Sequence, residues 1–332
     1  MDGERLLFET EREKILVEKK KECESKHGKV PEERTIEELL KSSIILVDKP
    51  SGPTSHQVVD YVKRILNIKK AGHSGTLDPG VTGVLPVALQ EGTRITNSLL
   101  NAGKEYVCLM HLHEDYEKDK ILGVLEEFTG KISQLPPKKS AVKRQQRYRN
   151  VYYIELLEVE GRDVLFRVGC EAGTYIRKLV HDIGLKLGSG AHMAELRRTK
   201  AGPFTEEKSV TLHDLADAYH YYKEGNENPL REMLLPLEEG VSHLKKIWVH
   251  DATVDSLCHG AFLKVPGVCS LETGIEKGET VCVMTLKGEL VLVGEALMDS
   301  MDMKNFDKGI AVRTKQVFMK PGTYPKYNPE KN

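Results

Sequence analysis

The most unusual stretch of this sequence is AGHSGTLDPGVTG, residues 71–83, in which four glycines, a proline and a histidine surround one carboxylate, Asp78. Glycine is used where the backbone must bend sharply or approach another group closely. An isolated Leu-Asp-Pro-Gly favours a simple β-turn, because Asp, Pro and Gly are all common turn residues. A turn needs one glycine rather than four, which favours a functional loop around Asp78. A phosphate-binding loop fits less well, since the Gly-Lys-Ser/Thr ending is missing.

Outward from this loop, short strands alternate with single helices. The periodicity predicts strands and a hairpin where β-branched and aromatic residues gather, and helices where one apolar stripe follows a capping residue. The predicted strands cover 44–50, 105–113 and the hairpin 151–170, and the predicted helices begin at Thr54 or Ser55 and span 174–190. This mixture predicts an α+β fold rather than regular βαβ winding.

The composition and the periodicity of the sequence change near residue 246. Residues 247 to about 319 hold short apolar runs, frequent glycines and almost no helical periodicity, which predicts a small all-β barrel. The first 35 residues are highly charged and predict an extension that docks on another part of the protein. The predicted division is therefore an extension (1–35), a catalytic domain (36–246), a barrel (247–322) and a tail (323–332).

Composition favours a globular intracellular protein. The chain has 332 residues, 39% hydrophobic and 30% charged, enough to build a core. It shows no secretory signal at its start and no apolar run near the ~20 residues that span a bilayer, so we expect a cytoplasmic location. Its six cysteines are scattered, which predicts buried thiols and no disulfides.

Basic residues are segregated although the net charge is only −1. Residues 131–150 carry seven Lys/Arg and residues 311–328 carry four, and neither segment has an acid. Such stripes are typical of nucleic-acid binding, and solvated loops are the alternative.

Other motifs favour ordinary structural roles or a tertiary partner. Cys108, His111 and His113 have the spacing of metal ligands, but in a strand Cys108 points away from the two histidines, so we expect no metal site. The His-Asp pair in HDIG (181–184) lacks the further ligands of a metallohydrolase. Arg177 falls in the first turn of its helix, where the helix dipole disfavours a cation. This suggests a carboxylate partner, and a surface arginine that points into water is the alternative.

Five blocks in order resemble the tRNA T-loop and box H/ACA pseudouridine synthases: AGHSGTLDPGVTGVLPVAL, KEYV, PPKKSAVKR, GTYIRKL and GAHMAELRRTKAGPF. The resemblance covers about residues 36–322, and the C-terminal barrel is similar to a PUA domain. The charged extension, the residues of the basic loop (KSAVKRQQRYR) and the full barrel are similar to the archaeal, dyskerin-like branch. The resemblance implies a pseudouridine synthase fold, with a central mixed or antiparallel sheet flanked by helices. It also implies that the extension packs on the barrel.

The resemblance also implies the roles of particular residues. Asp78 matches the catalytic aspartate, Arg177 its arginine partner and Tyr106 the tyrosine that stacks on the target base. The implied substrate contacts are His73, Tyr175, Leu196 and Lys49. The implied RNA contacts are Lys139, Lys143, Arg144, Arg147, Arg313 and Lys315.

The implied activity is isomerisation of uridine to pseudouridine in rRNA or tRNA. Because the reaction has no net redox change, it implies no cofactor and no metal. The implied partners are a box H/ACA guide RNA, the target RNA and small protein subunits, with no membrane. A stand-alone enzyme acting on the tRNA T-loop is the first alternative, and a non-catalytic RNA scaffold is the second. The chain ends without a lysine-rich tail, so we expect no nucleolar targeting.

Overall fold

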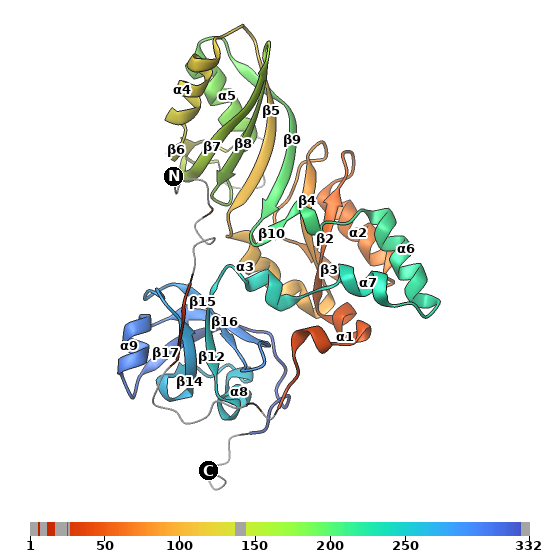
Figure 1. The fold of residues 1–332 in the computed structure, drawn as a ribbon, viewed down its shortest axis with the longest axis vertical. Helices are drawn as coiled ribbons and strands as arrows, with labels where there is room; N and C mark the ends of the chain where they lie inside the picture. Colours follow the sequence, from red (N-terminus) through yellow and green to blue (C-terminus); the bar gives the residue numbers. More distant parts are fainter. Residues whose placement is uncertain (1–5, 7–11, 17–24, 26, 137–143, 327–332) are drawn as a thin grey trace. The chain divides into compact units, whose positions relative to one another are not determined.

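The computed structural model describes Leu6 and residues 12–16, 25, 27–136 and 144–326 (Figure 1). These residues form two compact units. The first holds Leu6 and Ile44–Leu234, and the second holds the described residues from 12 to 43 together with those from Leu235 onward. This division differs from the predicted one, because residues 36–43 and 235–246 group with the barrel.

The first unit is one mixed sheet with helices beside it, as predicted for an α+β fold. Its strands are β2 (Ser43–Lys49), β3 (Ala71–His73), β4 (Thr82–Leu89), β5 (Lys104–Leu112), β6 (Gly130–Gln134), β7 (Arg147–Glu160), β8 (Asp163–Cys170), β9 (Ala191–Ala201) and β10 (Phe204–Thr205). Its helices are α2 (Ser55–Ile65), α3 (Thr96–Leu100), α4 (Lys118–Glu127), α5 (Ile176–Leu187), α6 (Leu212–Lys223) and α7 (Asn228–Met233), with 3-10 turns η2 (Gln90–Ile95) and η3 (Glu206–Lys208).

The strand order β2-β4-β9-β5-β8-β7-β6 divides this sheet into two parts. Strands β9, β5, β8, β7 and β6 pair antiparallel, and so do β2 and β4. The parts meet where β4 runs parallel to β9, with only Thr82 opposite Arg197 and Gly83 opposite Arg198. The loop that carries Asp78 leads directly into this junction.

Apolar stripes explain the placement of the helices. Helix α2 begins with a capping box between Thr54 and Gln57, and it buries Val58, Val59 and Val62. Helices α4 and α5 lie together beside the β5–β9 part, as Figure 1 shows in yellow and green. Their apolar faces share a core with the inward side chains of β5 and β8. In this core, Leu179 and Ile183 of α5 lie with Met110 of β5 and Phe166 of β8. Helix α5 therefore presents its first turn from a rigid support.

The second unit contains a curled sheet in the order β1-β14-β12-β15-β16-β17-β13. These strands are β1 (Lys14–Leu16), β12 (Lys245–Val249), β13 (Leu263–Lys264), β14 (Val268–Glu272), β15 (Thr280–Met284), β16 (Leu290–Ala296) and β17 (Ile310–Val317). Its other elements are η1 (Pro31–Glu33), α1 (Ile36–Lys41), β11 (Leu235–Pro236), η4 (Leu237–Val241), α8 (Asp251–Cys258), η5 (Val265–Gly267) and α9 (Ser300–Asn305). The all-β prediction for this region missed α8 and α9, because each is too short to show helical periodicity.

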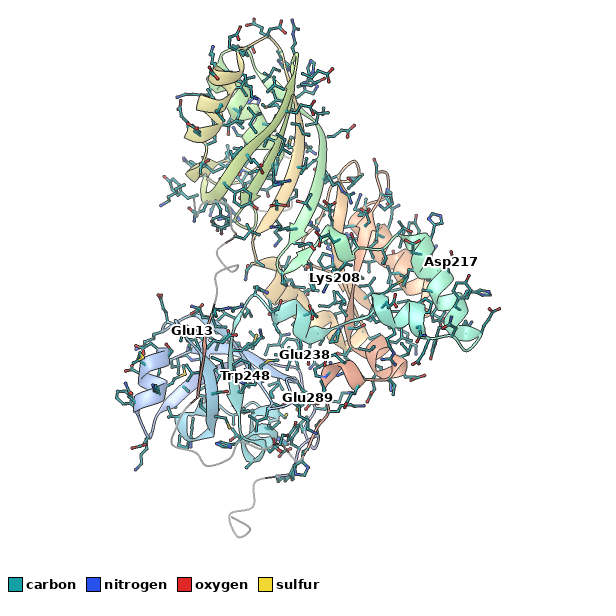
Figure 2. The ribbon with its side chains drawn as sticks, viewed as in Figure 1. Glu13, Lys208, Asp217, Glu238, Trp248 and Glu289 are labelled. Atoms are coloured by element: carbon teal, nitrogen blue, oxygen red, sulfur yellow. The ribbon has the colours of Figure 1, made fainter. Side chains whose placement is uncertain are left out.

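The N-terminal segment packs on this barrel, as the resemblance implied. Strand β1 pairs antiparallel with β14. Arg34 makes two hydrogen bonds of 2.8 and 2.9 Å to Glu238, which also accepts the Leu290 amide at 2.8 Å (Glu238 is labelled in Figure 2). Because Glu238 binds both Arg34, directly after η1, and the first residue of β16, the segments before and after the first unit belong to one compact body.

Two predictions about the class of protein, on membrane-spanning helices and on the cysteines, can be compared with the described residues. Within them, no helix has the length and apolar character to cross a membrane. The described cysteines are buried, as predicted for thiols in a core; they are Cys108, Cys170, Cys258, Cys269 and Cys282. Burial raises the pKa of the Cys108 thiol to about 12, which leaves it protonated.

Candidate active site

The backbone on both sides of Asp78 is held by buried polar side chains. Lys49, at the end of β2, is fully buried, and its ammonium donates to the carbonyl oxygens of Pro50, Pro79 and Val81 at 2.8–3.0 Å. The buried Ser55 hydroxyl, at the start of α2, accepts the Leu77 amide at 2.9 Å and donates to the Leu77 carbonyl at 3.0 Å. The loop is therefore fixed on both sides of the carboxylate.

This burial changes the interpretation of Lys49. We predicted a substrate contact, but the side chain is not exposed and its three donors are occupied by main-chain oxygens. Burial lowers the pKa of the Lys49 ammonium, and the nearby charge of Asp78 works in the opposite direction. The geometry favours a structural role for Lys49. It holds the backbone of the loop and places a positive charge near Asp78.

Two of the four loop glycines are required by geometry. Gly83 has φ +101°, and a Cβ there would lie 2.2 Å from the Arg198 carbonyl oxygen. Gly75 has φ +86°, and a Cβ there would lie 3.3 Å from an Arg198 guanidinium nitrogen. Gly72 and Gly80 have ordinary backbone angles and room for a side chain. The glycines therefore serve the close approach of β4 to β9 as much as the turn itself.

Asp78 and Arg177 meet across 99 positions of sequence. An Arg177 guanidinium nitrogen lies 2.5 Å from an Asp78 carboxylate oxygen, and both side chains are more than half exposed. This contact supplies the carboxylate that the position of Arg177, in the first turn of α5, had led us to expect. An exposed ion pair contributes only ~0–1 kcal/mol to stability. Its significance is orientation, because the carboxylate is fixed while remaining open to a ligand.

The start of α5 is held by Gln134, at the end of β6. Its buried side-chain amide donates to the Tyr175 carbonyl at 3.1 Å and accepts the Tyr175 amide hydrogen at 3.0 Å. Tyr175 is the N-cap residue, and its own side chain makes no capping bond. The pair of bonds replaces a cap and fixes the direction in which Arg177 leaves the helix.

Tyr106, the residue implied to stack on the base, lies in β5 between Arg198 of β9 and Val168 of β8. It is half-buried, and Arg198 is its cross-strand neighbour. Burial raises the pKa of the Tyr106 phenol, the nearby charge of Arg198 works in the opposite direction, and the charge of Asp78 adds to the rise.

His73 is the last residue of β3 and lies directly before the loop that carries Asp78. Its ring meets His56 edge to face, with centroids 4.9 Å apart. Burial lowers its pKa to about 4, with the charges of His56 and Arg198 acting in the same direction. The Nδ1 atom is buried and has no hydrogen-bond partner among the residues that the structure describes. His73 is therefore a neutral imidazole at neutral pH. Leu196, opposite Cys108, packs against the sheet core.

The residues expected to bind RNA are only partly described. Lys139 and Lys143 lie outside the described residues. Arg144 is exposed and Arg147 begins β7, while in the second unit the exposed Arg313 lies on β17. Lys315, on the same strand, forms a 2.5 Å ion pair with Glu295.

The metal alternatives find no support in the described part of the chain, where no group of three His, Cys, Asp or Glu side chains is placed to hold an ion. Cys108 is buried, whereas the His111 ring faces Asp163, with Nδ1 2.7 Å from a carboxylate oxygen. Asp182 of the HDIG segment pairs with Lys178 on the same helix.

Two supporting residues escaped the sequence analysis. Arg198 lies within a quoted block, as the second arginine of ELRRTK, but nothing in the sequence distinguishes a buried arginine from an exposed one. Gln134 precedes the basic loop, and only the fold brings it to the start of α5.

Four family models match the sequence in adjoining segments. The TruB family pseudouridylate synthase N-terminal domain matches residues 63–176, and the tRNA pseudouridylate synthase B C-terminal domain matches 177–242. A DKCLD (NUC011) domain matches residues 5–59, and a PUA domain matches 245–318.

Relatives are similar over nearly the whole chain. A probable tRNA pseudouridine synthase B from Thermococcus kodakarensis is 58% identical over 322 residues, 96% of this chain and 95% of the relative. One of the same description from Methanopyrus kandleri is 55% identical over 323 residues, 97% and 95% of the two chains.

Solved structures agree with these relatives. A chain from a Cbf5-Nop10-Gar1 complex has a TM-score of 0.93 at 54% identity, covering 97% of this chain and 98% of that one. A chain from an H/ACA RNP bound to a substrate RNA containing 2′-deoxyuridine has a TM-score of 0.91 at 52% identity, covering 98% and 100%. The identity, extent and domain order together show that this chain belongs to the TruB family of pseudouridylate synthases, with an N-terminal DKCLD domain and a C-terminal PUA domain.

Proposed function

We propose that this protein converts uridine to pseudouridine in RNA as the catalytic subunit of a box H/ACA guide-RNA particle. The observation that carries the chemistry is the Asp78 carboxylate, fixed by Arg177 at 2.5 Å and still more than half exposed. The guided mode is supported by similarity over nearly the full length to chains solved in a Cbf5-Nop10-Gar1 complex and in an H/ACA RNP with substrate RNA.

The reaction is an isomerisation whose atoms balance without a co-reactant. The N1–C1′ bond of uridine breaks, the uracil turns, and a C5–C1′ bond forms. C5 then loses its proton to a base, the C5=C6 double bond is restored, and N1 takes up a proton. Asp78 can start this sequence as a nucleophile at the sugar or as a base that removes a sugar proton. Either route needs one positioned carboxylate and no metal or cofactor.

The surroundings of Asp78 fit a base that has been turned out of its stack. An enzyme acting on a paired or stacked base must first extrude it. Stacking on an aromatic ring is worth ~1–3 kcal/mol per base, and Tyr106 offers such a ring. We assign the Tyr106 hydroxyl to the release of the C5 proton, and the neutral His73 and the Tyr175 side chain to contacts with the target nucleotide.

The basic residues give the proposal its RNA surface. Lys139, Lys143, Arg144 and Arg147 would contact phosphates near the target, and Arg313 and Lys315 would contact the guide. We place the functional boundaries as predicted, with catalysis in 36–246 and guide binding in 247–322. Small protein subunits would complete the particle, and we place it in the cytoplasm.

A stand-alone tRNA enzyme is the second candidate. It is favoured by the description of relatives as probable tRNA pseudouridine synthase B. The same site would serve both modes, so the choice depends on RNA delivery. A non-catalytic scaffold is disfavoured, since it would have no need of the fixed and exposed Asp78.

The chemistry is tested by tritium release from RNA labelled at uridine C5. Asp78→Asn keeps the side-chain shape and removes the charge, so it should abolish release while RNA affinity and the melting temperature stay near those of the unmodified protein. Asp60→Asn is the matched control, because Asp60 is an exposed aspartate on α2 that pairs with Lys63 outside the site. Substantial release by the Asp78 variant would remove this residue from its assigned role.

The guided mode is tested with the full chain and two substrates. An rRNA target should be modified only with its guide RNA and the small partner proteins, while a tRNA T-loop should respond little to the guide. Efficient T-loop modification by the chain alone, with no guide-dependent rRNA activity, would put the stand-alone enzyme first.

A further inference from the structure

Gln134 is buried at the end of β6, with only 3% of its surface exposed, and its amide binds one residue with both of its polar atoms. Nε2 donates to the Tyr175 carbonyl at 3.1 Å, and Oε1 accepts the Tyr175 amide hydrogen at 3.0 Å. A glutamine amide offers a donor and an acceptor in one plane. The pair of bonds therefore holds the peptide groups on both sides of Tyr175.

Tyr175 is the point from which α5 and its arginine start. Its carbonyl also accepts the amide hydrogens of Lys178 and Leu179, the first hydrogen bonds of the helix. Two positions after Tyr175, the Arg177 guanidinium lies 2.5 Å from the Asp78 carboxylate. A change in the orientation of the Tyr175 peptide groups would therefore move the first turn of α5, and with it the side chain that orients the carboxylate.

Gln134 also marks the start of the basic loop. It is the last residue of β6 and lies opposite Arg147, the first residue of β7. The basic loop, residues 135–146, joins these two strand ends and carries the exposed Arg144. An apolar side chain would fill the same buried space, so packing alone does not call for an amide. The strand end that carries the proposed RNA contacts is thus bonded to the start of the catalytic helix.

We propose that Gln134 is a positioning residue for the isomerisation, because it ties the start of α5 to the strand end from which the RNA-binding loop leaves. It acts through the backbone of Tyr175 and touches no reacting atom. This inference rests on the proposed function, since it presumes that the Asp78–Arg177 pair acts on uridine. Loss of the amide leaves the charges of the basic loop in place and frees the direction of Arg177.

The test uses two variants of Gln134 and a matched control. Gln134→Met keeps a similar length and removes both hydrogen bonds, whereas Gln134→Glu introduces a carboxyl that can donate only when it is protonated. Gln146→Met is the control, because Gln146 lies on the same hairpin, is exposed and donates to the Ser133 hydroxyl at 2.6 Å. Each chain is assembled with guide RNA and partner proteins. Single-turnover tritium release at saturating substrate is measured across pH, with RNA affinity by filter binding and folding by melting temperature.

We expect Gln134→Met to slow release by up to ~10²-fold, the scale of a reacting group misplaced by ~1 Å. RNA affinity should change by less than about threefold, because the lost contact belongs to the chemical step rather than to binding. Gln146→Met should match the unmodified protein in rate and in affinity.

Gln134→Glu gives a readout that a packing role would not move. Below the pKa of the introduced carboxyl, its O–H can donate to the Tyr175 carbonyl while its other oxygen accepts the Tyr175 amide hydrogen. Above that pKa, the carboxylate still accepts but faces the carbonyl oxygen without a proton. The rate of this variant, relative to that of the unmodified protein, should therefore rise as pH falls through the pKa of the introduced carboxyl.

The outcomes separate this inference from the proposed function. Absence of guide-dependent release by the unmodified particle would overturn the proposed function itself. In an active particle, an unchanged rate for Gln134→Met, or a loss confined to RNA affinity, would show that Gln134 does not position the site. A rate loss with no recovery of Gln134→Glu at low pH would reduce Gln134 to a packing residue. If Gln134→Met does not fold, the pH dependence of Gln134→Glu decides alone.

Discussion

Replacing Gly83 by alanine should break the junction between the two parts of the catalytic sheet. A Cβ at this position would lie 2.2 Å from the Arg198 carbonyl oxygen and 2.8 Å from its amide nitrogen. Both atoms belong to backbone that pairs with β4, so neither can move aside cheaply. A non-glycine residue at positive φ costs of order 1–3 kcal/mol, and overpacking adds about 1–3 kcal/mol. We therefore expect a loss of roughly 2–6 kcal/mol in the free energy of unfolding.

Gly80→Ala is the matched control within the same loop. Gly80 has an ordinary backbone angle and nothing within 4 Å of its added Cβ. Alanine there restricts the unfolded chain and should change stability by less than about 1 kcal/mol, in the stabilising direction. Urea unfolding of both variants, followed by far-UV circular dichroism, gives the comparison. Equal unfolding curves for the two variants would refute the argument that close approach to β9, rather than turn formation, requires glycine at position 83.

Three further predictions concern RNA and protons. Tyr106→Phe should keep RNA affinity in a filter-binding assay and Tyr106→Ala should weaken it; equal affinities would count against stacking. Replacing Arg144 and Arg147 by alanine should flatten the salt dependence of RNA binding by a slope of ~0.9 per duplex contact or ~0.7 per single-strand contact. Arg162→Ala, which removes an arginine paired with Asp115, should not. His73 binds a proton only near pH 4 when folded but near 6.5 when unfolded, so its contribution to stability is lost as pH falls through this window. The difference in melting temperature between the protein and His73→Phe should narrow there, and a constant difference would contradict the assignment.

The parts of the fold with strong local signals could be predicted from the sequence. A capping box and an apolar stripe define α2, and α5 ends at Leu187, where Gly188 with φ +114° caps it. The pairing of Arg177 could also be predicted, because a cation at a helix start is unfavourable unless something compensates it. That the partner is Asp78, 99 positions away, came from the resemblance and not from periodicity.

What could not be predicted depends on burial of polar groups. Lys49 looks like any lysine at the end of a strand, and only the fold shows that three carbonyl oxygens surround it. Gln134 replaces a helix cap from another strand, which leaves no trace in the sequence around Tyr175. The grouping of residues 36–43 and 235–246 with the second unit also depends on such contacts. Glu238 is bound to Arg34 and to the Leu290 amide, and these contacts are distant in sequence.

Two buried cations lie beside the site, and main-chain oxygens hold both of them. The hydrogen bonds of the Lys49 and Arg198 side chains in the described residues go to carbonyl oxygens. A carboxylate partner would neutralise each charge, as Asp48 and Glu206 do for Arg197. Neutral oxygens fix a cation without cancelling its field, so the charge of Lys49 reaches Asp78 and the charge of Arg198 reaches the Tyr106 phenol. Because RNA brings phosphates to the site, a loop held in this way keeps a positive charge beside the carboxylate that the chemistry needs.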